Sequence, residues 1–140
     1  MIFFDTSALV PTYVDDHIHS RSSQAAFNAV PPASRACSQH SLAEIFNTLT
    51  KPSFSYRATP SQAGDFLAYL RGNTKIVELT TKDYFTAFDG LIRLNLMGGV
   101  IYDALLLQAA RKVNAEIIYT WNVKHFQQLA PDLASRIRTP

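Results

Sequence analysis

The sequence lacks the features that mark several large classes of protein. It has one cysteine, Cys37, so no internal disulfide can form, and we expect a reducing, cytoplasmic environment. No stretch approaches the roughly 18 consecutive apolar residues of a membrane span. No basic segment precedes the apolar N-terminal residues, so we expect no signal peptide and no membrane partner. No glycine-rich loop follows the first apolar run, which argues against a P-loop or dinucleotide-binding fold.

Net charge is also small. The 140 residues sum to +2, too little to indicate nucleic-acid binding by itself. The charge is unevenly distributed, because residues 1–50 sum to −2 and residues 104–140 sum to +3. A basic C-terminal region therefore permits a polyanionic partner without requiring one.

Short apolar runs alternate with segments of helical spacing. We expect strands over residues 1–5, 34–38, 75–79 and 116–120, and helices over residues 18–29, 41–51, 60–71, 82–96, 102–113 and 122–129. Strands separated by helices of this length need right-handed crossovers and form a mainly parallel sheet. The sequence therefore predicts one three-layer α/β domain over residues 1–140.

Local signals predict several helix ends. Pro11 is expected to break the chain after the first strand, and Ser41 to cap the helix that follows the second strand. Thr59 and Gln62 fit a capping box, with Gly72 just beyond the end of that helix. The inward face of the 82–96 helix is expected to consist of Phe85, Phe88, Leu91 and Ile92.

Four acid or amide groups fall where the predicted strands end. Asp5 ends the first strand, and Asn122 follows the fourth. Glu44 and Asp103 lie in the first turns of two predicted helices. Ligand sites in open parallel sheets form at the carboxyl ends of the strands, so we expect all four at one edge of the sheet.

Each of these residues also has a purely structural interpretation. Ser41 and Glu44 fit a capping box, Asp103 complements a helix dipole, and Asp5 and Asn122 fit caps or turns. Together they are harder to explain in this way, because two carboxylates about 4 Å apart repel by about 4 kcal/mol at an effective dielectric near 20. Hard divalent cations take oxygen ligands. The cluster therefore predicts a Mg²⁺ or Mn²⁺ site.

Four segments stand out in chain order: FFDTSAL, SLAEIFNTL, YDALLLQAA and TWNVKHF. They resemble the motifs of PIN-domain ribonucleases, and most closely those of the VapC toxins of bacterial toxin–antitoxin pairs. The resemblance implies a PIN-like three-layer domain with a central, mainly parallel sheet of four or five strands. It also implies a metal-dependent endoribonuclease that hydrolyses RNA, a cognate antitoxin protein and a homodimer.

The resemblance also implies roles for individual positions. Asp5 and Asp103 correspond to direct metal ligands, and Glu44 to an acid that binds metal or orients the attacking water. Asn122 stands at a position that holds Asp or Asn and completes the pocket. Two hydroxyl positions that support these ligands are matched by Ser7 and Thr120.

Other residues near these motifs are assigned more weakly. His125 stands where many relatives carry a further acid, which puts a second tightly held metal ion in doubt, and we expect it to be an exposed histidine without a role. Trp121 is expected to serve the core rather than to stack on a base. Aromatic and basic residues alternate in the segment KPSFSYRATP, as in surfaces that bind unstacked RNA, although a loop-packing role is the commoner one. They are Lys51, Phe54, Tyr56 and Arg57.

Two other functions fit parts of the pattern. A haloacid-dehalogenase-type phosphohydrolase also has an aspartate after its first strand, but it needs a second aspartate where Ser7 stands. A catalytically inactive PIN-like module that binds RNA or protein is compatible with Asn122 and His125. Concentrated negative charge repels RNA, however, so three acids argue against such a module. Metal-dependent turnover distinguishes the two.

Overall fold

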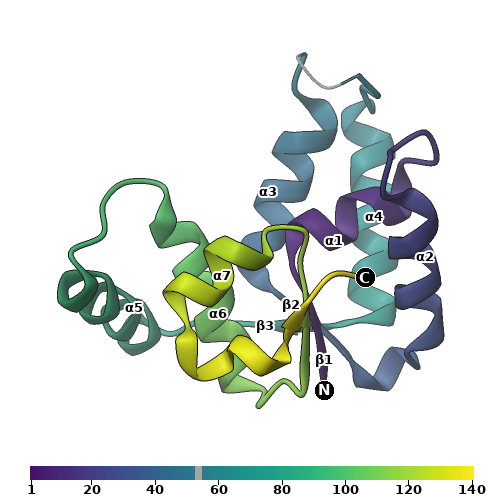
Figure 1. Cartoon of the computed structure of the whole chain (residues 1–140). Coiled ribbons are helices and arrows are strands. Elements are labelled where there is room, and N and C mark those ends of the chain that lie inside the picture. Colours follow the sequence, from purple (N-terminus) through teal and green to yellow (C-terminus); the bar gives the residue numbers. More distant parts are fainter. Residues whose placement is uncertain (53–54) are drawn as a thin grey trace.

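The computed structural model describes residues 1–52 and 55–140, and its centre is a parallel sheet (Figure 1). Five strands lie in the order β3-β2-β1-β4-β5, and every pairing between neighbours is parallel. They are β1 (Ile2–Phe4), β2 (Arg35–Ser38), β3 (Lys75–Val77), β4 (Ile117–Tyr119) and β5 (Ile137–Arg138). The predicted α/β architecture with a parallel sheet of four or five strands is confirmed, and β5 is the strand that the sequence pattern did not indicate.

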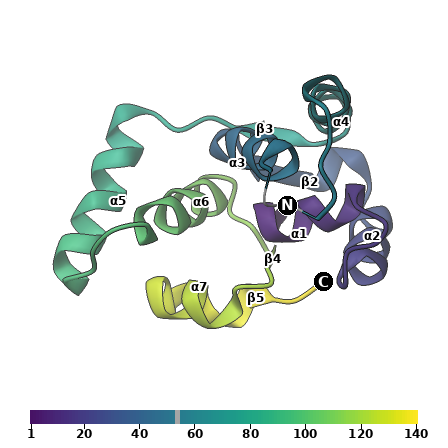
Figure 2. The ribbon, with the colours of Figure 1, turned by 90° about the horizontal axis from the view of Figure 1, so that it is seen from above.

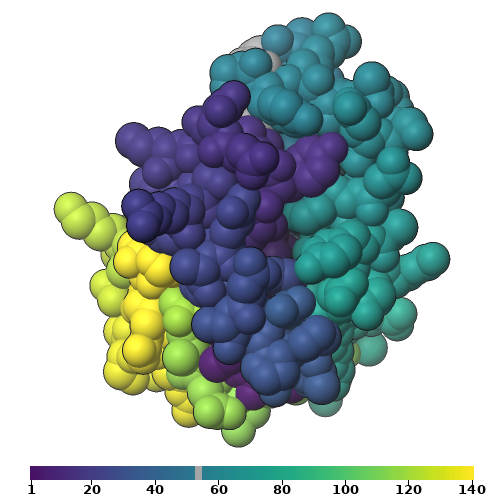
Figure 3. Space-filling view, turned by 90° about the vertical axis from the view of Figure 1, so that its right-hand side faces the viewer, coloured from purple at the N-terminus to yellow at the C-terminus, as the bar shows by residue number. Residues whose placement is uncertain are grey.

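Helices cover both faces of the sheet (Figure 2). They are α1 (Thr6–Tyr13), α2 (Ser20–Ala29), α3 (Gln39–Thr50), α4 (Pro60–Asn73), α5 (Thr81–Leu94), α6 (Val100–Lys112) and α7 (Val123–Leu129). Successive residues of β1 face opposite cores: Phe4 packs with residues of α1 to α4, and Phe3 packs with residues of α6 and α7. The space-filling view shows α2 and α4 on the outer surface of the first of these layers (Figure 3), whereas every residue of α1 is buried or half-buried. No helix in the described part of the chain is long and apolar enough to cross a membrane.

The chain turns from β1 directly into a helix. Asp5 is the N-cap of α1, and its side chain accepts a hydrogen bond from the Ser7 amide. The predicted break at Pro11 is wrong, because Pro11 lies inside α1. Pro11 is buried together with Ala8, Leu9 and Val10, so packing against the core outweighs the local preference of proline.

Two other helix ends differ from the sequence prediction. α3 begins two residues earlier than expected, because Ser38 rather than Ser41 is its N-cap and accepts from the His40 amide. Glu44 is therefore in the second turn of α3 and forms no capping box. The capping box of Thr59 and Gln62 on α4 is confirmed, but Gly72 lies within that helix rather than after it.

The predicted inward face of α5 is mostly wrong. α5 packs against α6, and Ala87 and Leu91 are its buried residues. Phe85 and Ile92 remain 61% and 74% exposed. The reason is the position of α5 at the periphery, where Figures 1 and 2 show α6 between it and the sheet.

Candidate active site

Asp5 directly follows β1, the central strand of the sheet, at its carboxyl end, and is 2% exposed. Its Oδ2 accepts hydrogen bonds from Ser7 Oγ at 2.5 Å, Thr120 Oγ1 at 2.8 Å and the Ser7 amide at 3.3 Å. Among the described residues, no donor reaches Oδ1. One carboxylate oxygen is thus held in place while the other remains available for a ligand.

The two hydroxyls that hold Asp5 are themselves fixed by the chain after β4. Ser7 Oγ accepts from the Trp121 amide at 2.9 Å, and Thr120 Oγ1 accepts from the Asn122 amide at 3.0 Å. Each hydroxyl therefore has its own proton free to donate to Asp5. Ser7 and Thr120, which were expected to support the site acids, thus both hydrogen-bond Asp5.

The second acid comes from α3. Glu44 Oε2 accepts a 2.5 Å hydrogen bond from Thr6 Oγ1, the side chain that follows Asp5 in sequence. His40 Nε2 lies 3.9 Å from the other oxygen, Oε1. The Glu44 side chain is 29% exposed, so it is both tethered to α1 and open to solvent.

The third acid, Asp103, comes from the first turn of α6. Its Oδ2 lies 3.6 Å from His125 Nδ1, and its side chain is 23% exposed. His125 is 64% exposed, as expected, but it lies beside a site residue. Asn122 is the N-cap of α7 but makes no side-chain capping hydrogen bond, so its amide group is not consumed by the helix start.

Burial and neighbouring acids raise the pKa values of Asp5 and Asp103. Burial raises the pKa of Asp5 to about 6, opposed by the hydrogen bonds from Ser7 and Thr120 and reinforced by the charges of Asp103 and Glu44. Burial also raises the pKa of Asp103; the proximity of His125 opposes this rise and that of Glu44 adds to it. Ionisation of these carboxyl groups is thus unfavourable, and a bound cation would offset its cost.

One cavity of about 560 Å³ joins these residues. All four sequence-predicted site residues line it, namely Asp5, Glu44, Asp103 and Asn122. The four groups expected at one edge of the sheet thus surround one space, and Glu44 and Asp103 reach it from helices, as predicted.

The donors of this cavity suit a hard divalent cation. Carboxylate and amide oxygens are the ligands that Mg²⁺ and Mn²⁺ prefer. Within the described ranges, no group of three or more His, Cys, Asp or Glu is arranged as a preformed metal centre. The residues therefore fit an ion held by one or two carboxylates, such as Asp5 and Asp103, and completed by water, which is how Mg²⁺ is usually bound.

Sequence reasoning missed part of the cavity lining. The segment between α1 and α2 contributes His17, Ile18 and His19, and Trp121 lines the cavity instead of lying wholly in the core. The adjacency of Trp121 to Asn122 was the one local signal. No pattern pointed to the α1–α2 segment, because its position depends on how two helices fold back on each other.

The described residues of the basic and aromatic segment after α3 do not line this cavity, although Tyr56 shares a neighbouring pocket with His17. Phe54 is outside the described residues. Tyr56 packs edge-on against Tyr13 of α1 with ring centroids 6.0 Å apart, and Lys51 and Arg57 are exposed. This contact favours the loop-packing interpretation for Tyr56.

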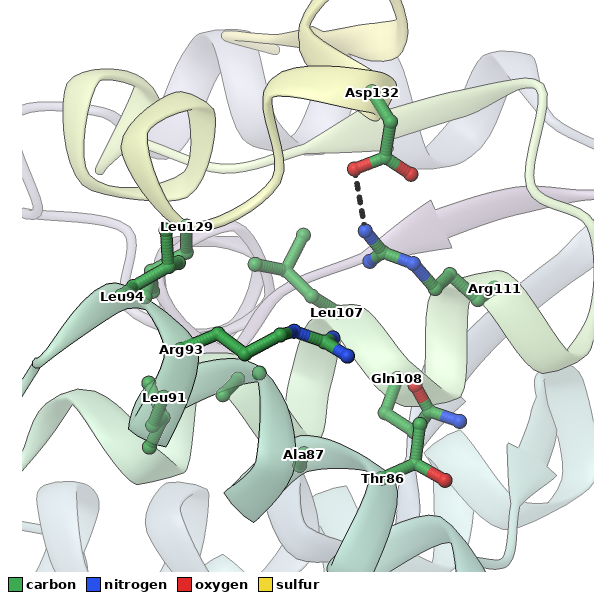
Figure 4. A pocket seen from close by; sticks show the side chains of 12 residues that line it. Thr86, Ala87, Leu91, Arg93, Leu94, Leu107, Gln108, Arg111, Leu129 and Asp132 are labelled. Carbon is green, nitrogen blue, oxygen red and sulfur yellow. Dashed lines mark hydrogen bonds and ion pairs between the residues drawn. The ribbon is translucent and has the colours of Figure 1, made fainter.

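A second cavity lies between α5 and α6 (Figure 4). It measures about 260 Å³ and is lined largely by apolar side chains and by Arg93 and Arg111. Arg111 Nη2 is 2.6 Å from Asp132 Oδ1, so its charge is already paired. The cavity contains none of the four predicted site residues and offers no acidic cluster.

Comparison with known proteins agrees with this architecture. The crystal structure of Mycobacterium tuberculosis VapC20, described as a toxin that cleaves the sarcin-ricin loop, superimposes with a TM-score of 0.73 at 18% sequence identity, covering 89% of this chain and 92% of that one. A chain of VapBC-1 from nontypeable Haemophilus influenzae superimposes with a TM-score of 0.64 at 20% identity, covering 99% and 98%. At these identities the likeness is one of fold.

Sequence comparison gives the family. No curated protein sequence matches this chain. The PIN domain family matches residues 2–130, a span that includes β1, all four site residues and α7. The chain therefore belongs to the PIN domain family.

Proposed function

We propose that this protein is a Mg²⁺- or Mn²⁺-dependent endoribonuclease and the toxin component of a toxin–antitoxin pair. The observation that carries the proposal is the convergence of Asp5, Glu44 and Asp103 on one cavity, with Asp5 fixed through Oδ2 and open at Oδ1. Family membership supports a nuclease, and the fold of both structural neighbours supports a toxin of the VapC type.

Asp5 and Asp103 are the residues that would hold the ion. When bound, such an ion lowers the pKa of a water molecule and offsets charge on the scissile phosphate. Glu44, tethered to Thr6, orients the attacking water, and the free amide of Asn122 completes the pocket. The reaction is hydrolysis by water, leaving a 5′-phosphate and a 3′-hydroxyl, and the 2′-hydroxyl of RNA takes no part.

Partners and location follow from the same proposal. One neighbour comes from a VapBC complex, so we propose a cognate antitoxin protein for this chain, covering the acidic cavity. We also propose a cytoplasmic location and a homodimer. Exposed apolar residues on and after α5 support association, because monomers seldom expose such patches. These residues are Phe85, Phe88, Ile92 and Met97.

The proposal is tested by RNA cleavage. A mixed-sequence RNA pool is incubated with the wild-type chain in Mg²⁺, Mn²⁺ or EDTA, beside Asp5→Asn and Asp89→Asn purified in the same way. Asp89 is an exposed acid of α5 and serves as the matched control. Metal-dependent cleavage by the wild type and by Asp89→Asn, lost in Asp5→Asn, is the expected result. Absence of cleavage under every condition would favour the inactive RNA- or protein-binding module.

A further inference from the structure

The active-site cavity has a second set of lining residues that the proposed hydrolysis does not use. They are aromatic or apolar, and comprise His17, Ile18, His19 and Trp121. The rings of His19 and Trp121 are stacked, with centroids 3.6 Å apart and planes 10° from parallel. The His17 ring lies 5.5 Å from that of His19 at 43°. Three flat side chains thus lie together, here called the aromatic wall, at a cavity that is also lined by three acids.

The aromatic wall is rigidly anchored to the catalytic elements. Trp121 Nε1 donates to Ser23 Oγ of α2 at 3.1 Å, and the Trp121 amide donates to Ser7 Oγ, which also holds Asp5. Trp121 is therefore held both at its indole nitrogen and at its backbone. A surface held in this way needs little ordering when a ligand binds.

The remaining two residues present a donor and an apolar surface. His17 Nδ1 accepts a hydrogen bond from the His19 amide at 3.1 Å, so in neutral imidazole the proton lies on Nε2. Burial lowers the pKa of His17, which favours that neutral form. Ile18, between His17 and His19 in the sequence, lines the cavity and is 89% exposed. An exposed isoleucine beside stacked rings offers contact to a flat, partly apolar group.

We propose that the aromatic wall binds an unstacked nucleobase of the RNA next to the phosphate that is cleaved at the acidic cluster. This inference rests on the proposed function. Proteins that read single-stranded RNA stack its bases on Trp, His, Phe or Tyr rings, and every base has a face that can stack. The acids of the cavity repel phosphate, so contact with the base supplies binding that the acidic cluster cannot.

The first test separates a stacking role from a structural one at a single position. His19→Leu keeps an apolar side chain without a π face, whereas His19→Phe restores the π face. The sequences at the cleaved ends of a random RNA pool are compared for the two variants and the wild type. We expect His19→Leu to raise KM and to change the base preference beside the cut, and His19→Phe to keep the wild-type profile.

The second test measures binding without cleavage. Trp121 is the only tryptophan of the chain, so its fluorescence reports on the aromatic wall. A single-stranded oligoribonucleotide is titrated into Asp5→Asn in EDTA, with and without His19→Leu or Ile18→Ser. Because Ile18 is so exposed, Ile18→Ser leaves the fold intact. We expect saturable quenching of the fluorescence. His19→Leu should weaken the affinity for the oligonucleotide by about 5- to 100-fold, which corresponds to the loss of one stacked base. An abasic oligonucleotide should not quench.

The outcomes separate the two proposals. Metal-dependent cleavage with identical profiles in all variants and no quenching would overturn the aromatic wall while leaving the nuclease standing. Uniform loss of cleavage at every sequence in both His19 variants would show a structural role and also overturn it. No cleavage by the wild type would refute the nuclease instead. In that case, quenching of Trp121 fluorescence by RNA would still support the aromatic wall as a base-binding site, and no quenching would overturn it.

Discussion

At the scale of single residues, the site concentrates its electrostatic cost on Asp5. This carboxylate is 2% exposed and lies near two other acids, so ionising it in the folded protein is unfavourable. The hydroxyls of Ser7 and Thr120 recover part of that cost. The balance leaves a group that is ionised at neutral pH yet destabilises the metal-free fold.

Replacing Asp5 by asparagine should therefore stabilise the metal-free protein at neutral pH. The pKa of Asp5 rises from 3.8 to about 6 on folding. The contribution of this group to the free energy of unfolding is therefore greatest below pH 4 and is lost as the pH rises through about 6. At pH 7.5 the loss is on the order of 3 kcal/mol. Urea unfolding in EDTA should show Asp5→Asn more stable than the wild type at pH 7.5, with the difference shrinking toward pH 4.

The same experiment with Mg²⁺ in place of EDTA provides the control. The ion should raise the free energy of unfolding of the wild type and leave Asp5→Asn unchanged. A variant less stable than the wild type at pH 7.5 would mean that the hydrogen bonds to Asp5 outweigh its burial.

The Thr120 hydroxyl should tune the acid that it holds. Thr120→Val removes a donor to Asp5 Oδ2 with little change in volume, so the pKa of Asp5 should rise further. The acidic limb of the kcat/KM profile should move to higher pH, and activity at neutral pH should fall by about 10- to 100-fold, as for other residues that orient metal ligands. Thr86→Val, an exposed threonine on α5, is the control. An unmoved acidic limb would contradict the role of Thr120.

At the level of secondary-structure elements, sequence patterns located most strands and helices but missed α1 and β5, and they located helix ends less well. The capping box of α4 is local, so Thr59 and Gln62 could be recognised from sequence. The predicted break at Pro11 and the predicted cap at Ser41 were wrong for a common reason. Both residues are buried, and packing in the core determines their environment. Local preferences carry no information about such packing.

Alanine variants of Ser38 and Ser41 test which of the two serines is the N-cap of α3. Ser38→Ala removes the N-cap acceptor of the His40 amide and should destabilise the fold by about 1 kcal/mol. Ser41 Oγ is buried and has no hydrogen-bond partner among the described residues, so Ser41→Ala should be neutral or slightly stabilising. Denaturant midpoints of the two variants measure the difference, and equal effects would refute the assignment.

At the scale of the whole molecule, a parallel sheet explains why the site could be predicted at all. The carboxyl ends of β1 and β4 are adjacent, which brings Asp5 and Asn122 to one edge from distant parts of the sequence. The aromatic wall could not be found in this way. His19 reaches Trp121 only because the segment before α2 folds over the end of β4, a path fixed by tertiary packing.

The exposed surface of α5 makes a prediction at the same scale. If it forms the homodimer contact, Ile92→Glu should shift the molecular mass in solution from two chains to one, measured by light scattering at several concentrations. The side chain is 74% exposed, so the monomer fold should be unaffected. Tyr69→Glu, at an exposed position on α4, is the control. A wild-type chain that is monomeric throughout would contradict the homodimer.

The activity that we propose for the acidic cavity is water-mediated, metal-dependent hydrolysis of RNA. The most direct measurement is end-group analysis of the RNA fragments that the wild-type chain produces in Mg²⁺ and fails to produce in EDTA. We predict 5′-phosphate and 3′-hydroxyl ends, because the 2′-hydroxyl does not take part. Fragments ending in a 2′,3′-cyclic phosphate, or cleavage that persists in EDTA, would contradict the account.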